Sequence, residues 1–205
     1  MDEASSIIST LNCPSCSTSI GEASSTTSGA SSPDIPQADI YVQYTNEGGV
    51  QDKLNIFDPI REEAYTQAHP EAVPARAFHV MCSEGDVDGI VELLMHVGDQ
   101  VPDVGEMVRY RDPLSGMTSG LHLAVTNMHE GVIWLLLWLS SSVPTSEFPP
   151  EARHSAESMG LGRLNIQPSH DIRLLKDEQG RTAEAMAREL DGPLLRLVES
   201  GLLAP

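Results

Sequence analysis

The cysteines are the first residues whose type and spacing could support a chemical site. Cys13 and Cys16 have the spacing of a zinc knuckle, but a structural zinc ion needs four ligands and no second pair follows. The third cysteine, Cys82, falls within a helical pattern. The sequence therefore favours an unstructured thiol pair over a metal or redox site, and the odd, low cysteine count suits a reducing compartment.

No catalytic motif stands out. The acidic string from Gly85 to Gly89 is too short for a calcium-binding loop and lacks the distal Glu, whereas it fits a turn between two helices. The chain contains no Gly-x-Ser-x-Gly elbow and no phosphate-binding loop ending in Lys-Ser or Lys-Thr. We therefore expect a protein that is not an enzyme, with no catalytic residues, no metal and no cofactor.

The charge of the chain excludes several partners. The 205 residues carry a formal net charge of −18, and no Lys or Arg occurs from Met1 to Asp52. Such a charge repels nucleic acid and anionic membranes. The longest apolar run, Val132 to Leu139, has eight residues, whereas roughly 20 are needed to span a bilayer. With no signal peptide visible, we expect a soluble cytoplasmic or nuclear monomer that binds another protein.

The first part of the chain has the composition of a tail. Ser and Thr account for 15 of the first 32 residues, too polar a stretch to offset the entropy of ordering. Residues 1–72 are therefore predicted to be a disordered or weakly structured acidic tail. Within it, Ile40 to Tyr44 could form a short strand or a partner-binding segment, and Asp58 to Ala68 could form a helix with Pro59 in its first turn.

From Val73 onward, apolar residues recur at helical spacing in three successive pairs of segments. These pairs cover about residues 77–94, 121–139 and 182–201. The second and third pairs are each preceded by an Asp-x-x-(x)-Gly-x-Thr string, from Asp112 to Thr118 and from Asp177 to Thr182. A repeated turn followed by two helices suggests a repeat architecture.

The second unit resembles the ankyrin-repeat family through Asp112, Gly116-Met117-Thr118, Leu121-His122-Leu123-Ala124-Val125 and Asn127-Met128-His129. The resemblance implies an all-α fold of about three stacked ankyrin-like helix pairs over residues 73–201, acting as a non-catalytic protein–protein interaction module. Two repeats are longer than the family period of about 33 residues. The excess places an insertion at about 140–171, either a long ordered loop, a mobile segment or a degenerate repeat.

The ankyrin resemblance also gives the histidines a structural role. In that family, the residue matched by His79 and His122 begins the inner helix and bonds to neighbouring turns. His129 occupies the turn between two helices, where the family often has His. The resemblance therefore implies that these side chains support the fold rather than catalysis or metal binding.

A second resemblance supplies an alternative function. The unit Asp177-x-x-Gly180-x-Thr182-Ala183, followed by Leu194-x-x-Leu197-Val198-Glu199-x-Gly201, is similar to the N-terminal part of fungal type IV protein arginine methyltransferases. In that family, an ankyrin part precedes a Rossmann-like domain that uses S-adenosylmethionine. This sequence holds no strand, Gly-rich loop and helix for that cofactor, so the resemblance implies a fragment or relative that lacks the cofactor-binding domain.

Two tryptophans are the leading candidates for partner binding. Trp134 and Trp138 lie four residues apart and hence on one face of a helix, at positions where the ankyrin family has polar residues. Their apolar surface could meet a partner. Alternatively, the insertion at 140–171 or the N-terminal segment could fold over them.

A basic cluster in the turn before the second helix pair is the other candidate. Arg109, Tyr110 and Arg111 stand next to each other in this strongly acidic chain. We expect them to project from one edge of the stack, where two guanidinium groups would suit an acidic partner protein. The sequence does not identify that partner.

Overall fold

The computed structural model describes residues 41–97, 101, 103–190 and 192–205. The chain divides into two compact units, Met1–Pro70 and Glu71–Pro205, and the expected repeat region 73–201 lies within the second. The described residues are mostly helical, with 59% helix and 11% strand. The expectation of an all-α fold was therefore too strict, because two short β-hairpins accompany the helices.

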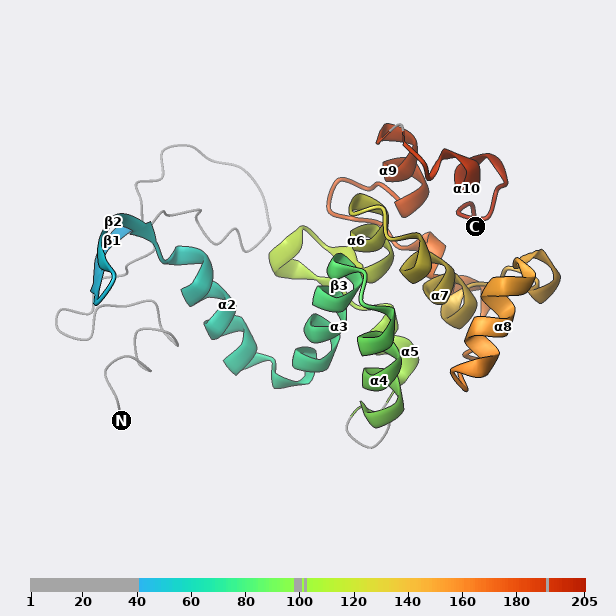
Figure 1. The fold of residues 1–205 in the computed structure, drawn as a ribbon, viewed down its shortest axis with the longest axis horizontal. Coiled ribbons are helices and arrows are strands. Elements are labelled where there is room, and N and C mark those ends of the chain that lie inside the picture. Colours follow the sequence, from blue (N-terminus) through green and yellow to red (C-terminus); the bar gives the residue numbers. More distant parts are fainter. Residues whose placement is uncertain (1–40, 98–100, 102, 191) are drawn as a thin grey trace. The chain divides into compact units, whose positions relative to one another are not determined.

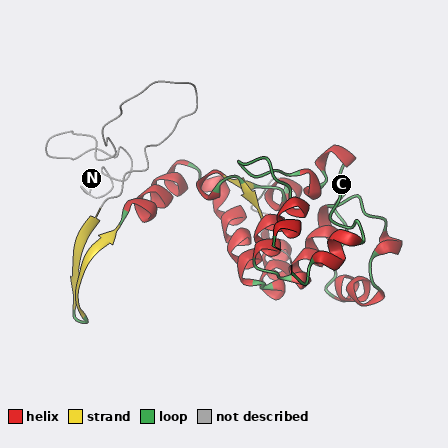
Figure 2. Cartoon of the chain, turned by 90° about the horizontal axis from the view of Figure 1, so that it is seen from above, coloured by secondary structure: helices red, strands yellow, loops and turns green. Residues whose placement is uncertain are grey.

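The first unit contains a hairpin and a helix. Strands β1 (Tyr41–Asn46) and β2 (Gly49–Asn55) pair in antiparallel fashion and are yellow in Figure 2. Helix α2 (Phe57–Ala68) follows, and its buried residue is Phe57. The strand and the helix suggested by the sequence are thus present.

Residues 41–70 consequently carry regular structure where the composition favoured a disordered or weakly structured tail. The two strands are almost entirely exposed, so main-chain pairing rather than burial defines the hairpin, and a composition argument does not detect such pairing. The prediction of disorder for residues 1–40, including Cys13 and Cys16, falls outside the described residues.

The second unit is built from helices and short 3-10 turns (Figure 1). Its helices are α3 (Val73–Glu84), α4 (Val87–Val97), α5 (Val104–Val108), α6 (Gly120–Thr126), α7 (Glu130–Ser140), α8 (Pro150–Ser158), α9 (Ala183–Glu189) and α10 (Leu195–Glu199). The three expected helix pairs correspond to α3 with α4, α6 with α7, and α9 with α10. Helices α5 and α8 were not predicted.

The Asp-containing strings before the second and third pairs fold as turns. Strands β3 (Arg111–Asp112) and β4 (Thr118–Ser119) pair in a short hairpin. Within it, the Asp112 carboxylate accepts hydrogen bonds from the Leu114 amide at 2.9 Å and the Ser115 hydroxyl at 3.2 Å. Asp177 likewise accepts the amides of Gln179 and Arg181. A carboxylate that bonds its own backbone fixes such a turn locally.

The turn between α3 and α4 needs a glycine. Gly85 has φ of 79°, a conformation that favours glycine, and a Cβ atom placed there would lie 2.5 Å from the Nδ1 atom of His129. The same imidazole bonds the Ser83 carbonyl through Nε2 at 3.0 Å. The first two helix pairs are thereby joined at this turn.

Helix α6 is central to the second unit. It contacts α3 on one side and α9 on the other, and it also packs against its own partner α7. At Gly120, a Cβ atom would come within 2.9 Å of the side chains of Cys82 and Phe78 on α3, so these side chains pack directly against the backbone of α6. The core runs continuously through these helices and includes the fully buried Ile133, Leu136 and Leu137 of α7.

The segment at 140–171 is ordered in the structure and holds one α-helix, α8, flanked by 3-10 turns at Thr145–Glu147 and Pro168–His170. Phe148 and Ala156 from this segment join the core. Among the described residues, no helix is long and apolar enough to cross a membrane.

Replacing Leu136 with Ala tests the shared core. The side chain is fully buried, so we expect the free energy of unfolding to fall by about 2–5 kcal/mol, measured by chemical denaturation. The matched control, Val80→Ala, removes methyl groups from a side chain that is 54% exposed and should change it by less than about 0.5 kcal/mol. Because α6 and α7 share one core with their neighbours, amide exchange should also accelerate in α3 and α9. Acceleration confined to residues 120–140 would contradict this coupling.

Candidate binding site beside the paired tryptophans

The C-terminal end of α7 is held by Arg163. Its guanidinium donates to the carbonyl oxygens of Trp138 at 3.1 Å, Ser141 at 2.5 Å and Val143 at 2.7 Å. The last carbonyls of a helix lack partners within the helix and attract a cation. Burial lowers the pKa of Arg163. This residue therefore terminates α7 and anchors the segment that follows it.

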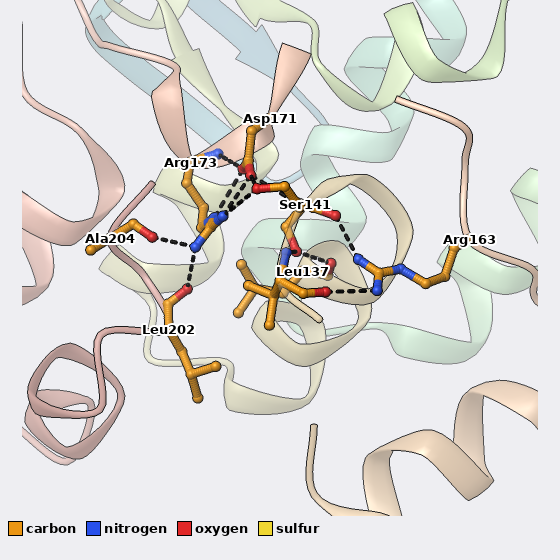
Figure 3. Close-up of polar contacts among 9 residues, drawn as sticks. Leu137, Ser141, Arg163, Asp171, Arg173, Leu202 and Ala204 are labelled. Atoms are coloured by element: carbon orange, nitrogen blue, oxygen red, sulfur yellow. Dashed lines mark hydrogen bonds and ion pairs between the residues drawn. The ribbon is translucent and has the colours of Figure 1, made fainter. Parts of the chain in front are cut away.

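A buried ion pair holds the same region from the other side (Figure 3). Arg173 and Asp171 lie 2.6 Å apart, with side chains only 7% and 2% exposed. The guanidinium also donates to the Ser142 hydroxyl at 2.9 Å and to the carbonyls of Leu202 and Ala204. These bonds connect the end of α7 to the C-terminal residues that follow α10.

The Asp171 carboxylate is stabilised in its charged form. Burial alone would raise its pKa, but hydrogen bonds from Arg173 and from the hydroxyl and amide of Ser142 lower the pKa to about 2. Both Ser142 contacts measure 2.7 Å. The Asp171 carboxylate is therefore charged near neutral pH, and it holds the Arg173 guanidinium in place.

The ordered insertion covers Trp138. Its ring is 7% exposed and meets Phe148 edge-on, with ring centroids 5.4 Å apart. Its indole N–H donates to the Leu161 carbonyl at 3.1 Å. Of the two alternatives for this residue, the structure thus shows covering by the chain's own segment.

Trp134 is only partly covered. Its ring lies 5.9 Å from Phe148, between centroids, and its indole N–H donates to Glu130 one turn earlier at 3.2 Å. The side chain is half-buried. The segment that covers Trp138 therefore leaves part of Trp134 facing an open space.

That space is a pocket of about 620 Å³ between α7, α8 and α10. This volume falls in the range of about 300–1,000 Å³ typical of ligand sites. Its lining is mainly apolar and includes Trp134, Leu135, Trp138, Phe148, Ala152, Ala156, Met159, Leu197 and Leu202. The polar residues on it include Glu130, Glu147, Glu151, Ser155, Arg196 and Ser200.

The basic cluster of Arg109, Tyr110 and Arg111 lies away from the pocket. Arg109 is half-buried after α5, and the ring of Tyr110 lies tilted against that of His79, with ring centroids 5.4 Å apart. Arg111 is exposed on β3 and donates to the Lys176 carbonyl at 3.1 Å. None of the three lines the pocket. The structure therefore brings the two tryptophans together at one site. Of the three turn residues expected to project from one edge, only Arg111 is exposed, because Arg109 and Tyr110 are half-buried and Tyr110 packs against the core.

His79 and His122 bond to carbonyls of distant turns. The Nε2 atom of His79 lies 3.2 Å from the Tyr110 carbonyl, and that of His122 lies 3.1 Å from the Arg181 carbonyl. These contacts assign the proton to Nε2 in each ring. Burial lowers the pKa of His79 to about 4 and also lowers the pKa of His122, so both are neutral near pH 7.

No metal site accompanies these residues. Within the described ranges, no group of three or more His, Cys, Asp or Glu side chains could hold a metal ion. Cys82 is buried, which raises the pKa of its thiol to about 12 and disfavours the reactive thiolate.

Comparison of the chain with known protein families, curated proteins and solved structures finds no match. The pocket must therefore be interpreted from its own residues. Sequence reasoning found its tryptophans but missed Phe148, Ala152 and Leu197, which come from three different segments. The one usable signal was Phe148 itself, a lone aromatic residue in the insertion, followed by Pro149 and Pro150.

Breaking the Asp171–Arg173 ion pair should lower the stability of the fold. Asp171→Asn leaves the Arg173 charge buried without its partner, so we expect a loss of about 3–5 kcal/mol in unfolding free energy. The control Glu184→Gln breaks an ion pair with Arg188, which is 61% exposed, and should cost less than about 1 kcal/mol. Adding Arg173→Met to Asp171→Asn should recover part of the loss. Equal losses for the test and control variants would contradict a buried, coupled pair.

The buried histidines predict acid sensitivity. Because the folded pKa of His79 lies near 4 and the unfolded value near 6.5, the unfolded state binds more protons between these values. Stability should therefore fall as the pH drops from about 6.5 to 4, by up to about 3 kcal/mol from His79, and His122 acts in the same direction.

Denaturation at several pH values measures this dependence. His79→Gln retains a donor near Tyr110 but cannot be protonated. The unfolding free energy of this variant should therefore change less between pH 6.5 and 4 than that of the wild type. The exposed His96→Gln serves as the control and should leave the slope unchanged. A His79→Gln variant with the wild-type slope would refute the assignment.

Proposed function

We propose that the chain is a non-catalytic protein-binding module of the ankyrin-repeat type. The observation that carries the proposal is the serial packing of helix pairs, in which α6 lies in contact with both α3 and α9. Arrays of this kind present extended surfaces that bind other proteins. The bonds from His79 and His122 to the turns at Tyr110 and Arg181 are of the kind that the family resemblance implies.

The surface chemistry also supports a protein partner. With a net charge of −18, the chain attracts cationic surfaces over a distance and repels nucleic acid. Two candidate contact regions differ in character. The turn edge carries the exposed Arg111, whereas the α7–α8–α10 side carries an apolar pocket beside Trp134.

Affinity purification of the full chain from a native extract tests the proposal. We expect partner proteins to be recovered in fixed stoichiometry by the wild type and lost with Leu136→Asp, which disrupts the core but retains the acidic charge. Proteins that are captured by charge alone would bind both the wild-type chain and the Leu136→Asp chain. Recovery that is equal for both chains, or no stoichiometric partner at all, would contradict a protein-binding module.

A second assay tests the alternative function drawn from the sequence, in which the chain is a fragment or relative of a fungal arginine methyltransferase. The purified chain is incubated with labelled S-adenosylmethionine and an Arg-rich protein substrate. Transfer of the label by the wild-type chain would overturn the non-catalytic assignment, and the expected result is none above the level of the Leu136→Asp chain.

A further inference from the structure

We infer that the pocket between α7, α8 and α10 binds a partner segment that presents an apolar side chain flanked by Lys or Arg. The inference rests on the proposed protein-binding function and names the site and the partner's chemistry. All residues that line the pocket belong to the second compact unit, so the site is complete within one folded body.

The interior of the pocket selects an apolar group. The two indole N–H groups at its wall are already used, by Glu130 for Trp134 and by the Leu161 carbonyl for Trp138. With these donors occupied, Trp134, Leu135 and Phe148 offer only ring and methyl surface. An apolar side chain entering the pocket gains free energy in proportion to the area it removes from water.

The charges around the pocket select a cation. Glu147 and Glu151 line it and are exposed, and neither forms an ion pair with any described residue. Glu130 and Arg196 also line it but pair with each other. The charge that is not paired at the pocket is therefore negative and comes from the Glu147 and Glu151 carboxylates, so a Lys or Arg next to the apolar anchor complements it.

The partner's cation belongs on these carboxylates rather than on the aromatic rings. The Arg163 guanidinium already lies 5.7 Å from the Trp138 ring centroid and 5.4 Å from that of Phe148. A second cation over the same rings would meet this charge. The apolar anchor of the ligand therefore lies inside the pocket, and its cation lies outside, next to Glu147 and Glu151.

The same charges argue against occupants from the chain itself. From Met1 to Asp52 the sequence has no Lys or Arg, so an N-terminal segment offers no cationic side chain to Glu147 and Glu151. A second copy would bring two chains of net charge −18 together, which repel each other. A basic partner protein is the occupant that fits both features.

A displayed library of random 12-residue peptides, selected on the full chain, tests the inference. We expect enriched peptides to share one or two large apolar residues next to Lys or Arg. Trp134 and Trp138 are the only tryptophans in the chain, so binding of a Trp-free peptide should change the intrinsic emission directly.

Matched variants then locate the binding. Glu147→Lys with Glu151→Lys changes exposed residues only and should weaken the selected peptides by about tenfold or more. Glu157→Lys alters the charge of an exposed residue on α8 that does not line the pocket, and it should have a much smaller effect. Ala152→Trp, which fills the pocket, should abolish binding in a chain that retains its circular dichroism.

The outcomes distinguish the site from the function. Peptides that bind the double Lys variant as well as the wild type, that lack basic residues, or that leave Trp emission unchanged would overturn the pocket assignment while leaving a protein-binding module intact. A concentration-dependent dimer that Ala152→Trp abolishes would assign the pocket to a second copy and also overturn it. The protein-binding function itself fails if the affinity purification recovers no stoichiometric partner, or recovers the same proteins equally with the Leu136→Asp chain.

Discussion

The second unit depends on how the buried end of α7 satisfies its carbonyl groups. This helix is apolar on nearly every face, and Ser140 and Ser141 at its end are buried, so water cannot complete the last hydrogen bonds. Arg163 supplies donors to three of the carbonyls in this region. The desolvation of one guanidinium is offset because it satisfies several acceptors at once.

The buried pair of Asp171 and Arg173 extends this arrangement to the C-terminal residues. Ordinarily, a buried ion pair adds little net stability because of the cost of removing both charges from water. Here the guanidinium also donates to the carbonyls of Leu202 and Ala204, so the pair determines which segments lie next to α7. The pair thereby connects the end of α7 to the residues that follow α10.

The pocket and the histidine contacts illustrate two different uses of polar groups. His79 and His122 are neutral and bond turn carbonyls inside the fold, where they link one helix pair to the next. Glu147 and Glu151 remain exposed beside an apolar surface, where they contribute nothing to the core. That contrast is what favours a recognition role for the pocket and a structural role for the histidines.

The sequence by itself determined the features that depend on neighbouring residues: the helix pairs, from apolar spacing, and the turns at Asp112 and Asp177, from carboxylates that bond their own backbone. It also indicated a strand near Tyr41 and the helix over Asp58–Ala68, but not the full hairpin. Tertiary structure alone decided that Phe148 covers Trp138, and that Arg163 and Arg173 reach carbonyls about 20–30 residues away in the chain. Those contacts depend on how separate segments pack, and no local periodicity encodes such packing.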